Sequence, residues 1–178
     1  MISTKEDLKE YMKEDFKALY PNGASYITRL KDPILKYEIL LRKCEYHRNR
    51  SLKNPYLKIS YLFLKYRFRS LGIKLGFSIP ENCFGPGLSI AHYGSIVINP
   101  SVVIGANCRI HTGVNIGANK TPTDVPVIGD NVYIGPGAKI FGSVTIGNNV
   151  KIGANAVVTN SFGNNVVVAG IPAKIING

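Results

Sequence analysis

The chain of 178 residues contains no tryptophan, three cysteines, three histidines and half as many acidic as basic residues. The cysteines are odd in number and far apart, so they predict neither a disulfide framework nor a CxxC zinc site. No apolar run reaches the 18 or so residues that a membrane-spanning helix needs. The charged stretch Met1–Glu14 lacks the apolar segment of a signal peptide. These absences favour a reduced, cytoplasmic protein.

The charges and the glycines divide the chain into two regions. Residues 1–75 contain 17 Lys or Arg and 8 Asp or Glu, whereas residues 76–178 contain 5 and 3. Of the 18 glycines, 17 follow residue 71. Such a change in composition predicts a change of architecture, with an N-terminal region over residues 1–75 and a second domain over residues 76–178.

The N-terminal region shows the signals of helices. Apolar residues recur at helical spacing after residue 7, and the turn-forming residues 21–23 predict the end of that first helix. Asp32 followed by Pro33 is typical of a helix start, with proline at the first helical position. Asn54-Pro55 predicts the start of a third helix, which ends at Gly72.

The second region is a six-residue repeat. A period of six fits neither a helix, with 3.6 residues per turn, nor simple strand alternation. It fits short strands separated by turns, with one aliphatic residue pointing inward on each side of a triangular coil. Stacked coils then bury a continuous aliphatic column that no single repeat forms alone. The large residues in phase are Ile98, Ile104, Ile110, Ile116, Ile128, Ile134, Ile140, Ile146, Ile152 and Val158.

The repeat is interrupted once, between Ile116 and Ile128. Residues 117–127 are therefore predicted to leave the coil as a loop, either as a tolerated insertion or as part of a site. Loops on a rigid scaffold are common places for binding sites. Lys120 and Asp124 lie in this loop, in a region that is otherwise almost bare of charge.

Two of the three histidines lie in the repeat region. His92 stands six residues before Ile98, where an aliphatic residue is expected, so a change of register is predicted to turn it outward. His111 follows 19 residues later, close to one coil of three hexapeptides, which places the two imidazoles in adjacent coils. A neutral imidazole with a pKa near 6.5 suits proton abstraction at neutral pH. A structural role for either histidine stays open at this point.

The segment from Ile90 to Gly117 resembles, without gaps, the part of serine acetyltransferases that contains their catalytic histidine. The repeats as a whole resemble the hexapeptide acyltransferases, over roughly residues 79–178. This resemblance implies a mainly β fold, a left-handed parallel β-helix preceded by a small helical region. It also implies acetyl-CoA as the acyl donor without a metal, His92 as the general base, and a homotrimer or a dimer of trimers.

The resemblance further implies the residues that contact coenzyme A. The C-terminal segment is similar to the family's terminal segment, in which a lysine approaches the coenzyme A phosphates. Several turns match those that line the pantetheine groove in relatives, where small residues let a thin ligand approach the backbone. The implied donor-binding residues are Gly117, Gly135, Pro136, Gly153, Ala154 and Lys174.

The acceptor is predicted from departures from the serine acetyltransferase pattern. Ala91 replaces an aspartate that helps to hold serine, Asp124-Val125 replaces an Arg-His pair, and Phe77 replaces the acid that orients the histidine. Serine carries two opposite charges that each need a partner, whereas a sugar needs neutral hydrogen bonds. We therefore expect an O-acetyltransferase acting on a sugar of a surface polysaccharide or its precursor. The alternative is a serine O-acetyltransferase of cysteine biosynthesis.

The predicted site contains residues from both the coils and the loop. His92 is the predicted base, and either Glu81 or a backbone carbonyl is predicted to orient its ring. The predicted acceptor-binding residues are His111, Tyr93, Asn115, Lys120 and Asp124.

Three further functions are weighed against this one. A γ-type carbonic anhydrase needs three histidine ligands for zinc, and His92 and His111 supply two. A non-catalytic hexapeptide scaffold would show the same repeats without turnover. The basic, tyrosine-rich N-terminal region is compatible with nucleic acid, but such stripes more often pack, and its charge also suits coenzyme A or a membrane surface. We expect no metal and no nucleic-acid partner, and we keep peripheral contact with a membrane as an alternative.

Overall fold

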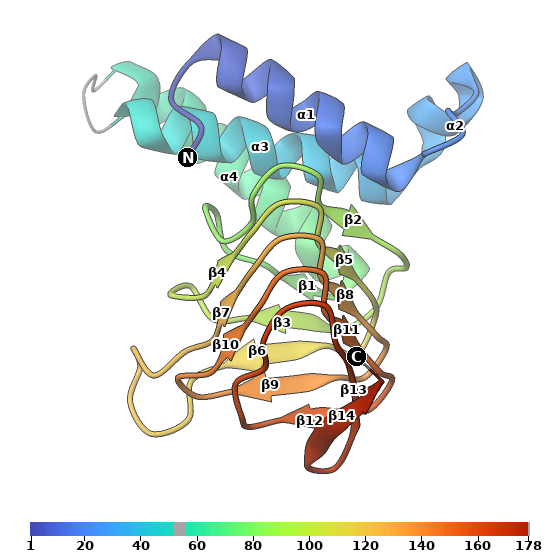
Figure 1. Ribbon diagram of the computed structural model, residues 1–178. Coiled ribbons are helices and arrows are strands. Elements are labelled where there is room, and N and C mark those ends of the chain that lie inside the picture. Colours follow the sequence, from blue (N-terminus) through green and yellow to red (C-terminus); the bar gives the residue numbers. More distant parts are fainter. Residues whose placement is uncertain (52–55, 178) are drawn as a thin grey trace.

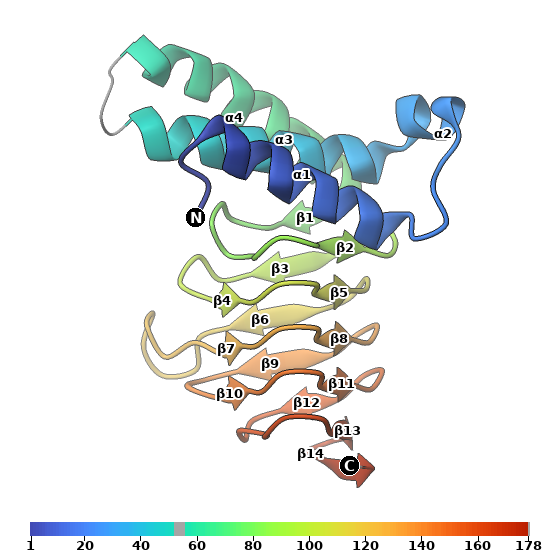
Figure 2. The same ribbon diagram turned by 45° about the horizontal axis from the view of Figure 1, so that its top comes forward.

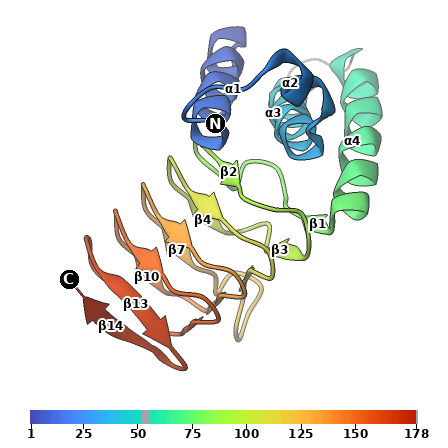
Figure 3. The same ribbon diagram turned by 90° about the vertical axis from the view of Figure 1, so that its right-hand side faces the viewer.

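The computed structural model describes residues 1–51 and 56–177, in which a layer of helices covers one end of a β-helix (Figure 1). The helix α3 lies between α1 and α4, and α2 is a short helix in the connection between α1 and α3 (Figure 3). No helix in the described part of the chain is long and apolar enough to cross a membrane. The helices are α1 (Lys5–Leu19), α2 (Tyr26–Lys31), α3 (Pro33–Ser51) and α4 (Tyr56–Leu75).

Local capping chemistry explains where two of these helices begin. The Thr4 hydroxyl accepts from the Asp7 backbone N–H, and the Asp7 carboxylate accepts from the Thr4 backbone N–H, which is a capping box. The predicted start at Pro33 is confirmed, because Asp32 Oδ1 accepts from the Ile34 backbone N–H at 2.7 Å. The predicted helix start at residues 54–55 lies outside the described residues.

The strands are short and form three parallel sheets, with one antiparallel hairpin at the C-terminal end (Figure 2). Sheet A contains β1 (Phe77–Ser78), β3 (Ile96–Ile98), β6 (Asn115–Gly117), β9 (Lys139–Phe141) and β12 (Val157–Val158). Sheet B contains β4 (Val103–Ile104), β7 (Val127–Ile128) and β10 (Thr145–Ile146). Sheet C contains β2 (Ser89–Ile90), β5 (Arg109–Ile110), β8 (Tyr133–Ile134), β11 (Lys151–Ile152), β13 (Val167–Gly170) and β14 (Ala173–Asn177).

The aliphatic column predicted from the six-residue period is confirmed. All ten large residues of the repeat are at most 3% exposed. The small or β-branched residue that stands two positions before most of them is buried as well. Neighbouring coils pair in register, so that Ile90, Ile110 and Ile134 lie one above another in sheet C. The core is therefore a continuous stack of side chains, with one layer contributed by each coil.

Each coil turns three corners, and three names are used for them below. The loop corner joins sheet A to sheet B and contains residues 79–83, 99–102 and the loop 118–126. The asparagine corner joins sheet B to sheet C and contains Asn107, Asn131, Asn149 and Asn165. The histidine corner joins sheet C to sheet A and contains residues 91–95, 111–114, 135–138 and 153–156.

The helical layer hydrogen-bonds to the open edge of the first coil. The fully buried Arg42 guanidinium of α3 donates to the carbonyls of Phe84 and Gly85, at 3.0 and 2.7 Å. It also forms ion pairs with the buried carboxylates of Asp15, at 2.7 Å, and Glu45, at 3.0 Å. A buried charge is tolerated when it is paired and hydrogen-bonded in this way.

Buried carboxylates satisfy the amides of the same edge. Asp15 Oδ1 accepts from the backbone N–H groups of Gly87 and Leu88, at 2.8 and 2.9 Å. Glu38 Oε1 accepts from the Ile90 N–H at 3.1 Å. The first coil has no preceding coil to accept hydrogen bonds from its amides, and an open end leaves such backbone groups unpaired. The carboxylates of Asp15 and Glu38 accept these hydrogen bonds instead.

Candidate active site

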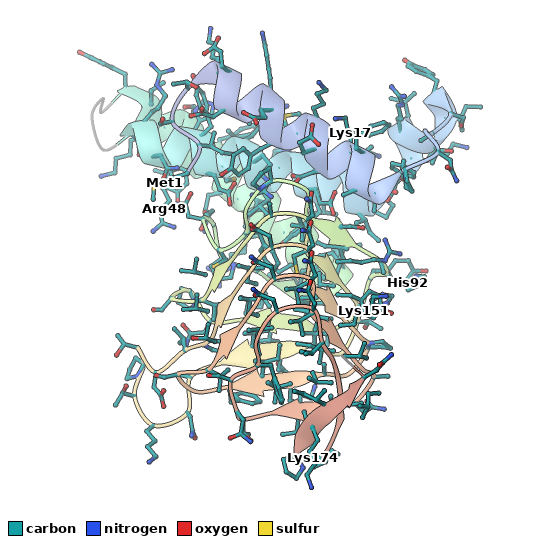
Figure 4. All side chains as sticks on the ribbon, viewed as in Figure 1. Met1, Lys17, Arg48, His92, Lys151 and Lys174 are labelled. Carbon is teal, nitrogen blue, oxygen red and sulfur yellow. The ribbon has the colours of Figure 1, made fainter. Side chains whose placement is uncertain are left out.

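The two histidines of the repeat region meet at the histidine corner. His92 follows β2 and is exposed, and His111 follows β5 in the next coil and is half-buried. Their ring centroids lie 6.2 Å apart at an angle of 57°. The prediction that adjacent coils bring them together is confirmed. Figure 4 shows His92 projecting from the flank of the β-helix rather than into its column.

His111 has an unusual environment for a polar ring. Its Nε2 atom is buried and has no hydrogen-bond partner among the described residues. Burial, together with the positive charge of Arg109 and the neighbouring His92, lowers the pKa of His111 below its ordinary value. His111 is therefore neutral at pH 7, with one ring nitrogen left unpaired.

Two residues that the sequence did not single out complete this surface. The Tyr133 ring lies 5.0 Å from the His111 ring, centroid to centroid. The Lys139 ammonium donates to the Gly113 carbonyl, in the same turn as His111. Both side chains precede an inward isoleucine in the repeat, and that outward position was the signal that could have identified them.

The turns below the histidines carry no long side chains. Gly135 and Pro136 follow β8, and Gly153 and Ala154 follow β11, so all four lie at the histidine corner in the two coils after His111. Gly135 is explained by coil stacking, because a Cβ there would lie 2.8 Å from the Ala154 backbone nitrogen. Pro136 and Ala154 are exposed. The corner thus continues from the histidines as a strip of small residues that suits a thin, extended ligand.

Several predicted acceptor-binding residues lie elsewhere in the same chain. Tyr93 is exposed beside His92, as the prediction required. Asn115 instead lies on the outer face of β6, where it lines a shallow depression of about 200 Å³ with Asn99 and Phe141. Lys120 and Asp124 lie in the loop, at a different corner from His92.

Asp124 holds the loop in place. Its carboxylate accepts from the Lys120 backbone N–H at 3.1 Å and from the Ser143 backbone and hydroxyl in the next coil. The Ser143 hydroxyl and the Lys120 amide lower the pKa of Asp124. Both carboxylate oxygens are thus engaged within the chain, which gives Asp124 a structural task besides any contact with an acceptor.

Glu81, one of the two partners predicted for His92, is engaged by other side chains in this chain. Glu81 lies at the loop corner, where its buried carboxylate accepts from Lys65, from the Tyr61 hydroxyl at 3.3 Å and from Arg48 at 3.4 Å. Arg48 of α3 and Tyr61 and Lys65 of α4 reach this corner and donate hydrogen bonds to the carboxylate. These contacts favour the other predicted partner of His92, a backbone carbonyl, which stays a prediction.

The remaining donor-binding predictions lie at two different places. Gly117 ends β6, where a Cβ would meet the Phe141 ring at 3.1 Å, so packing accounts for its size. Lys174 lies in β14 at the far end of sheet C, well away from His92 (Figure 4). Neighbouring strands are about 4.8 Å apart, and β14 is the fifth strand from β2 in this sheet. A ligand touching both residues must lie extended along the corner.

Two family models match the repeat region. Residues 126–160 match the bacterial transferase hexapeptide, described as six repeats, and residues 95–120 match the hexapeptide repeat of succinyl-transferase. Together they cover the coils that contain His111 and the strip of small residues.

Several similar proteins are serine acetyltransferases. The serine acetyltransferase of Staphylococcus xylosus is 44% identical over 99 residues, which are 54% of this chain and 46% of that protein. The chain therefore spans less than half the length of this curated relative. A solved serine O-acetyltransferase from Brucella melitensis, a bacterial transferase hexapeptide-repeat protein, is 30% identical with a TM-score of 0.71. The match covers 97% of this chain and 68% of that one.

The chain belongs to the hexapeptide-repeat acyltransferases and is serine acetyltransferase-like. The serine acetyltransferase of Brucella abortus strain S19, solved in complex with coenzyme A, is also similar, with 29% identity and a TM-score of 0.71. That match covers 97% of this chain and 69% of that one. The left-handed β-helix predicted for this hexapeptide-repeat acyltransferase is confirmed by its likeness to these structures.

Proposed function

We propose that this hexapeptide-repeat acyltransferase transfers an acetyl group from acetyl-CoA to a hydroxyl group at the histidine corner. The observation that carries the proposal is the pairing of an exposed His92 with a half-buried, neutral His111, 6.2 Å apart, above a strip of small residues. No second cluster of titratable side chains in the described residues combines exposure with such a strip.

In the proposed reaction, the His92 imidazole removes the proton of the acceptor hydroxyl as its oxygen attacks the thioester carbonyl. A new ester bond forms, the carbon–sulfur bond breaks, and the proton passes to the departing sulfur to give free coenzyme A. Removal of the proton is needed because a neutral hydroxyl is a poor nucleophile. His111 lies beside His92 as a neutral ring, so the base does not face a second positive charge there.

The donor is proposed to lie along the histidine corner. Pro136 and Ala154 border the strip, and the Lys174 ammonium at its far end suits the coenzyme A phosphates. The named complex of a similar acetyltransferase with coenzyme A supports this choice of donor. The residues present fit a long, thin ligand with an anionic end.

L-Serine is the acceptor that the relatives favour, in place of the sugar expected from the sequence. Every relative described above is named as a serine acetyltransferase. Arg109, whose charge acts on His111, and Lys139, which donates to the Gly113 carbonyl two residues after His111, suit the carboxylate of serine. A sugar hydroxyl remains the second candidate, because the chain has few charges to pair with those of serine. Ala91 and Val125 are uncharged, and Asp124 in the loop already accepts from Ser143.

A homotrimer is proposed to complete the site. Within one chain the loop and the histidine corner are apart, so the acceptor contacts predicted for Lys120 and Asp124 need a neighbouring subunit. Val97, Val103 and Val127 are exposed on the outer faces of the coils, as expected for surfaces that pack against a second copy. Light scattering tests this assembly, and a stable monomer with full activity would contradict it.

Release of free thiol from acetyl-CoA tests the function. The assay compares L-serine with nucleotide sugars and oligosaccharides, at equal concentration and with His92→Ala as the blank. Turnover with L-serine alone selects the serine acetyltransferase, and turnover with sugars alone selects the second candidate. If coenzyme A binds but no hydroxyl acceptor is acetylated, the proposal fails and a non-catalytic scaffold is favoured.

A further inference from the structure

The long helix α4 has a composition unlike the rest of the helical layer. Its 20 residues include five basic side chains and no acidic one. It is also rich in aromatic and large aliphatic residues, of which Phe68 belongs to the buried hydrophobic core and Leu64, Leu71 and Leu75 pack against that core. The five basic residues are Lys58, Lys65, Arg67, Arg69 and Lys74.

The inner face of α4 packs against the rest of the chain. Phe68 is buried and stacks on Tyr37 of α3, with ring centroids 4.8 Å apart. Gly72 lies so close that a Cβ would be 3.2 Å from the same tyrosine ring. The ion pair of Lys65 with Glu81 continues along this side. The inner face therefore contacts α3 and the first coil, and a pocket of about 520 Å³ lies beside Phe68 and Gly72.

The outer face of α4 is apolar and exposed. At about 100° per residue, five large apolar residues fall within an arc of about 100° on the side opposite Phe68. Figure 3 shows that α4 lies at the outer side of α3, away from α1, so no other helix covers this face. The five residues and their exposed fractions are Ile59 (77%), Leu62 (56%), Phe63 (62%), Tyr66 (73%) and Ile73 (72%).

Basic residues border this apolar stripe on both sides. On the same helical projection, Lys58 and Arg69 fall along one edge and Arg67 and Lys74 along the other. All four are exposed, and none forms an ion pair within residues 1–51 and 56–177. The Arg67 guanidinium lies 5.8 Å from the centroid of the Phe63 ring. Long basic side chains in these positions can cover an apolar surface with their stems while their charges reach outward.

We propose that the outer face of α4 binds the surface of a bilayer that contains anionic lipids, with the helix lying parallel to the membrane plane. The apolar stripe would enter the boundary between headgroups and acyl chains, and the two rows of cations would meet lipid phosphates. A second copy of the same face is a poor occupant, because it would bring eight unpaired cations together without an acidic partner. No described helix spans a membrane, so this contact is peripheral.

Flotation of the whole protein with lipid vesicles tests the proposal. One set of vesicles contains phosphatidylcholine alone, and the other contains phosphatidylcholine and phosphatidylglycerol in a three-to-one ratio. We expect the protein to float with the anionic vesicles, to stay behind with the neutral ones, and to be released by high salt. Absence of binding to the anionic vesicles at low salt would overturn the proposal.

Matched variants localise the contact to α4. Ile59→Ser with Phe63→Ser is expected to lower the partition coefficient at least tenfold, and Ile176→Ser, at an exposed position in β14, leaves it unchanged. Arg67→Gln with Lys74→Gln is expected to lower it similarly, whereas Lys9→Gln with Lys13→Gln, an equal change of charge on α1, has little effect. If the α4 variants and the control variants lowered the partition coefficient equally, the assignment to this face would be overturned.

Two further measurements distinguish a membrane contact from a contact between two copies of the chain. The chain has no tryptophan, so Tyr66→Trp gives a single reporter whose emission should shift to shorter wavelength on anionic vesicles. Light scattering without lipid should give the same mass for Ile59→Ser with Phe63→Ser as for the parent protein. A smaller assembly would show that the face joins two copies and would overturn the proposal. Thiol release with soluble acceptors is expected to be unchanged in all these variants, so the membrane contact and the acetyl transfer are tested independently.

Discussion

The asparagine corner and the histidine corner are built from the same coils, yet they differ in how their side chains are used. At the asparagine corner, Asn107 donates to Asn131, Asn131 to Asn149 and Asn149 to Asn165, over 2.8 to 3.1 Å. These four residues have φ between 56° and 61°, a conformation that asparagine tolerates better than most residues. Each polar side chain is thus satisfied by the coil above or below.

The histidine corner lacks such a ladder. His111 keeps a buried ring nitrogen without a partner, and among the described residues Asn155, at φ 56°, has no side-chain hydrogen bond although it adopts the backbone of the ladder asparagines. A buried polar group without a partner calls for an explanation, and a functional role is one of them. The comparison indicates that one corner fixes the stack and the other is left open for binding.

The largest effect is expected from removing the base at the histidine corner. His92→Ala should lower turnover by roughly two to four orders of magnitude, because the acceptor proton then has no base. The melting temperature should stay near that of the parent protein, since the His92 side chain is exposed. Thiol-release kinetics and circular dichroism measure the two quantities. Near-normal turnover would transfer the role of base to His111.

A break in the asparagine corner should affect stability and not turnover. Asn131→Ala loses two ladder hydrogen bonds and a residue type suited to positive φ, so we expect a loss of about 1–3 kcal/mol in the free energy of unfolding. Asn131→Gly keeps the backbone conformation and should lose less of the free energy of unfolding. Asn155→Ala, at the same φ without a ladder bond, is the control at the histidine corner. Urea unfolding gives the three values, and equal losses for Asn131→Ala and Asn155→Ala would mean that the ladder contributes nothing.

The loop corner provides a test of the Glu81 assignment. Burial, the largest single cause, raises the pKa of Glu81, but the hydrogen bond from Lys65, a backbone hydrogen bond and the charges of Lys65 and Arg48 together outweigh it, and the net shift is downward. A carboxyl whose folded pKa is depressed stabilises the fold above its unfolded pKa, near 4.5, and this contribution is lost as the pH falls through the folded pKa. Glu81→Gln should therefore destabilise the protein by about 1–2 kcal/mol at pH 7 and flatten the acid side of its stability profile.

Turnover discriminates between the two roles considered for Glu81. If the carboxylate serves the interface between the helices and the first coil, kcat of Glu81→Gln stays within about twofold of the parent value. Loss of a group that orients the catalytic base would instead lower kcat about tenfold or more. The second result would restore Glu81 to the site.

The smallest effect concerns the pH dependence of His111. Because its pKa is lowered in the folded protein, the unfolded chain binds more protons at and below about pH 6.5, so stability falls as the pH falls through this range. His111→Gln should remove that contribution and reduce the difference in melting temperature between pH 7 and pH 5. An unchanged difference would show that His111 titrates normally.

The sequence by itself determined the coil architecture and the meeting of the two histidines. Which residues point inward depends on the phase of a short repeat, and phase is a local property that can be counted along the chain. Ile140 is buried because it is in phase, and His92 is turned outward at a point where the phase changes. The separation of 19 residues then placed His111 in the next coil without any knowledge of the neighbours.

The tertiary structure alone decided the partners of the long charged side chains. Asp15 accepts from the Gly87 and Leu88 amides, more than 70 residues away, and Glu81 accepts from Lys65 of α4. No repeat encodes these contacts, because they depend on how the helical layer meets the first coil. A buried charge pairs with whatever group lies near it once water is excluded, and that neighbourhood exists only after the chain has folded.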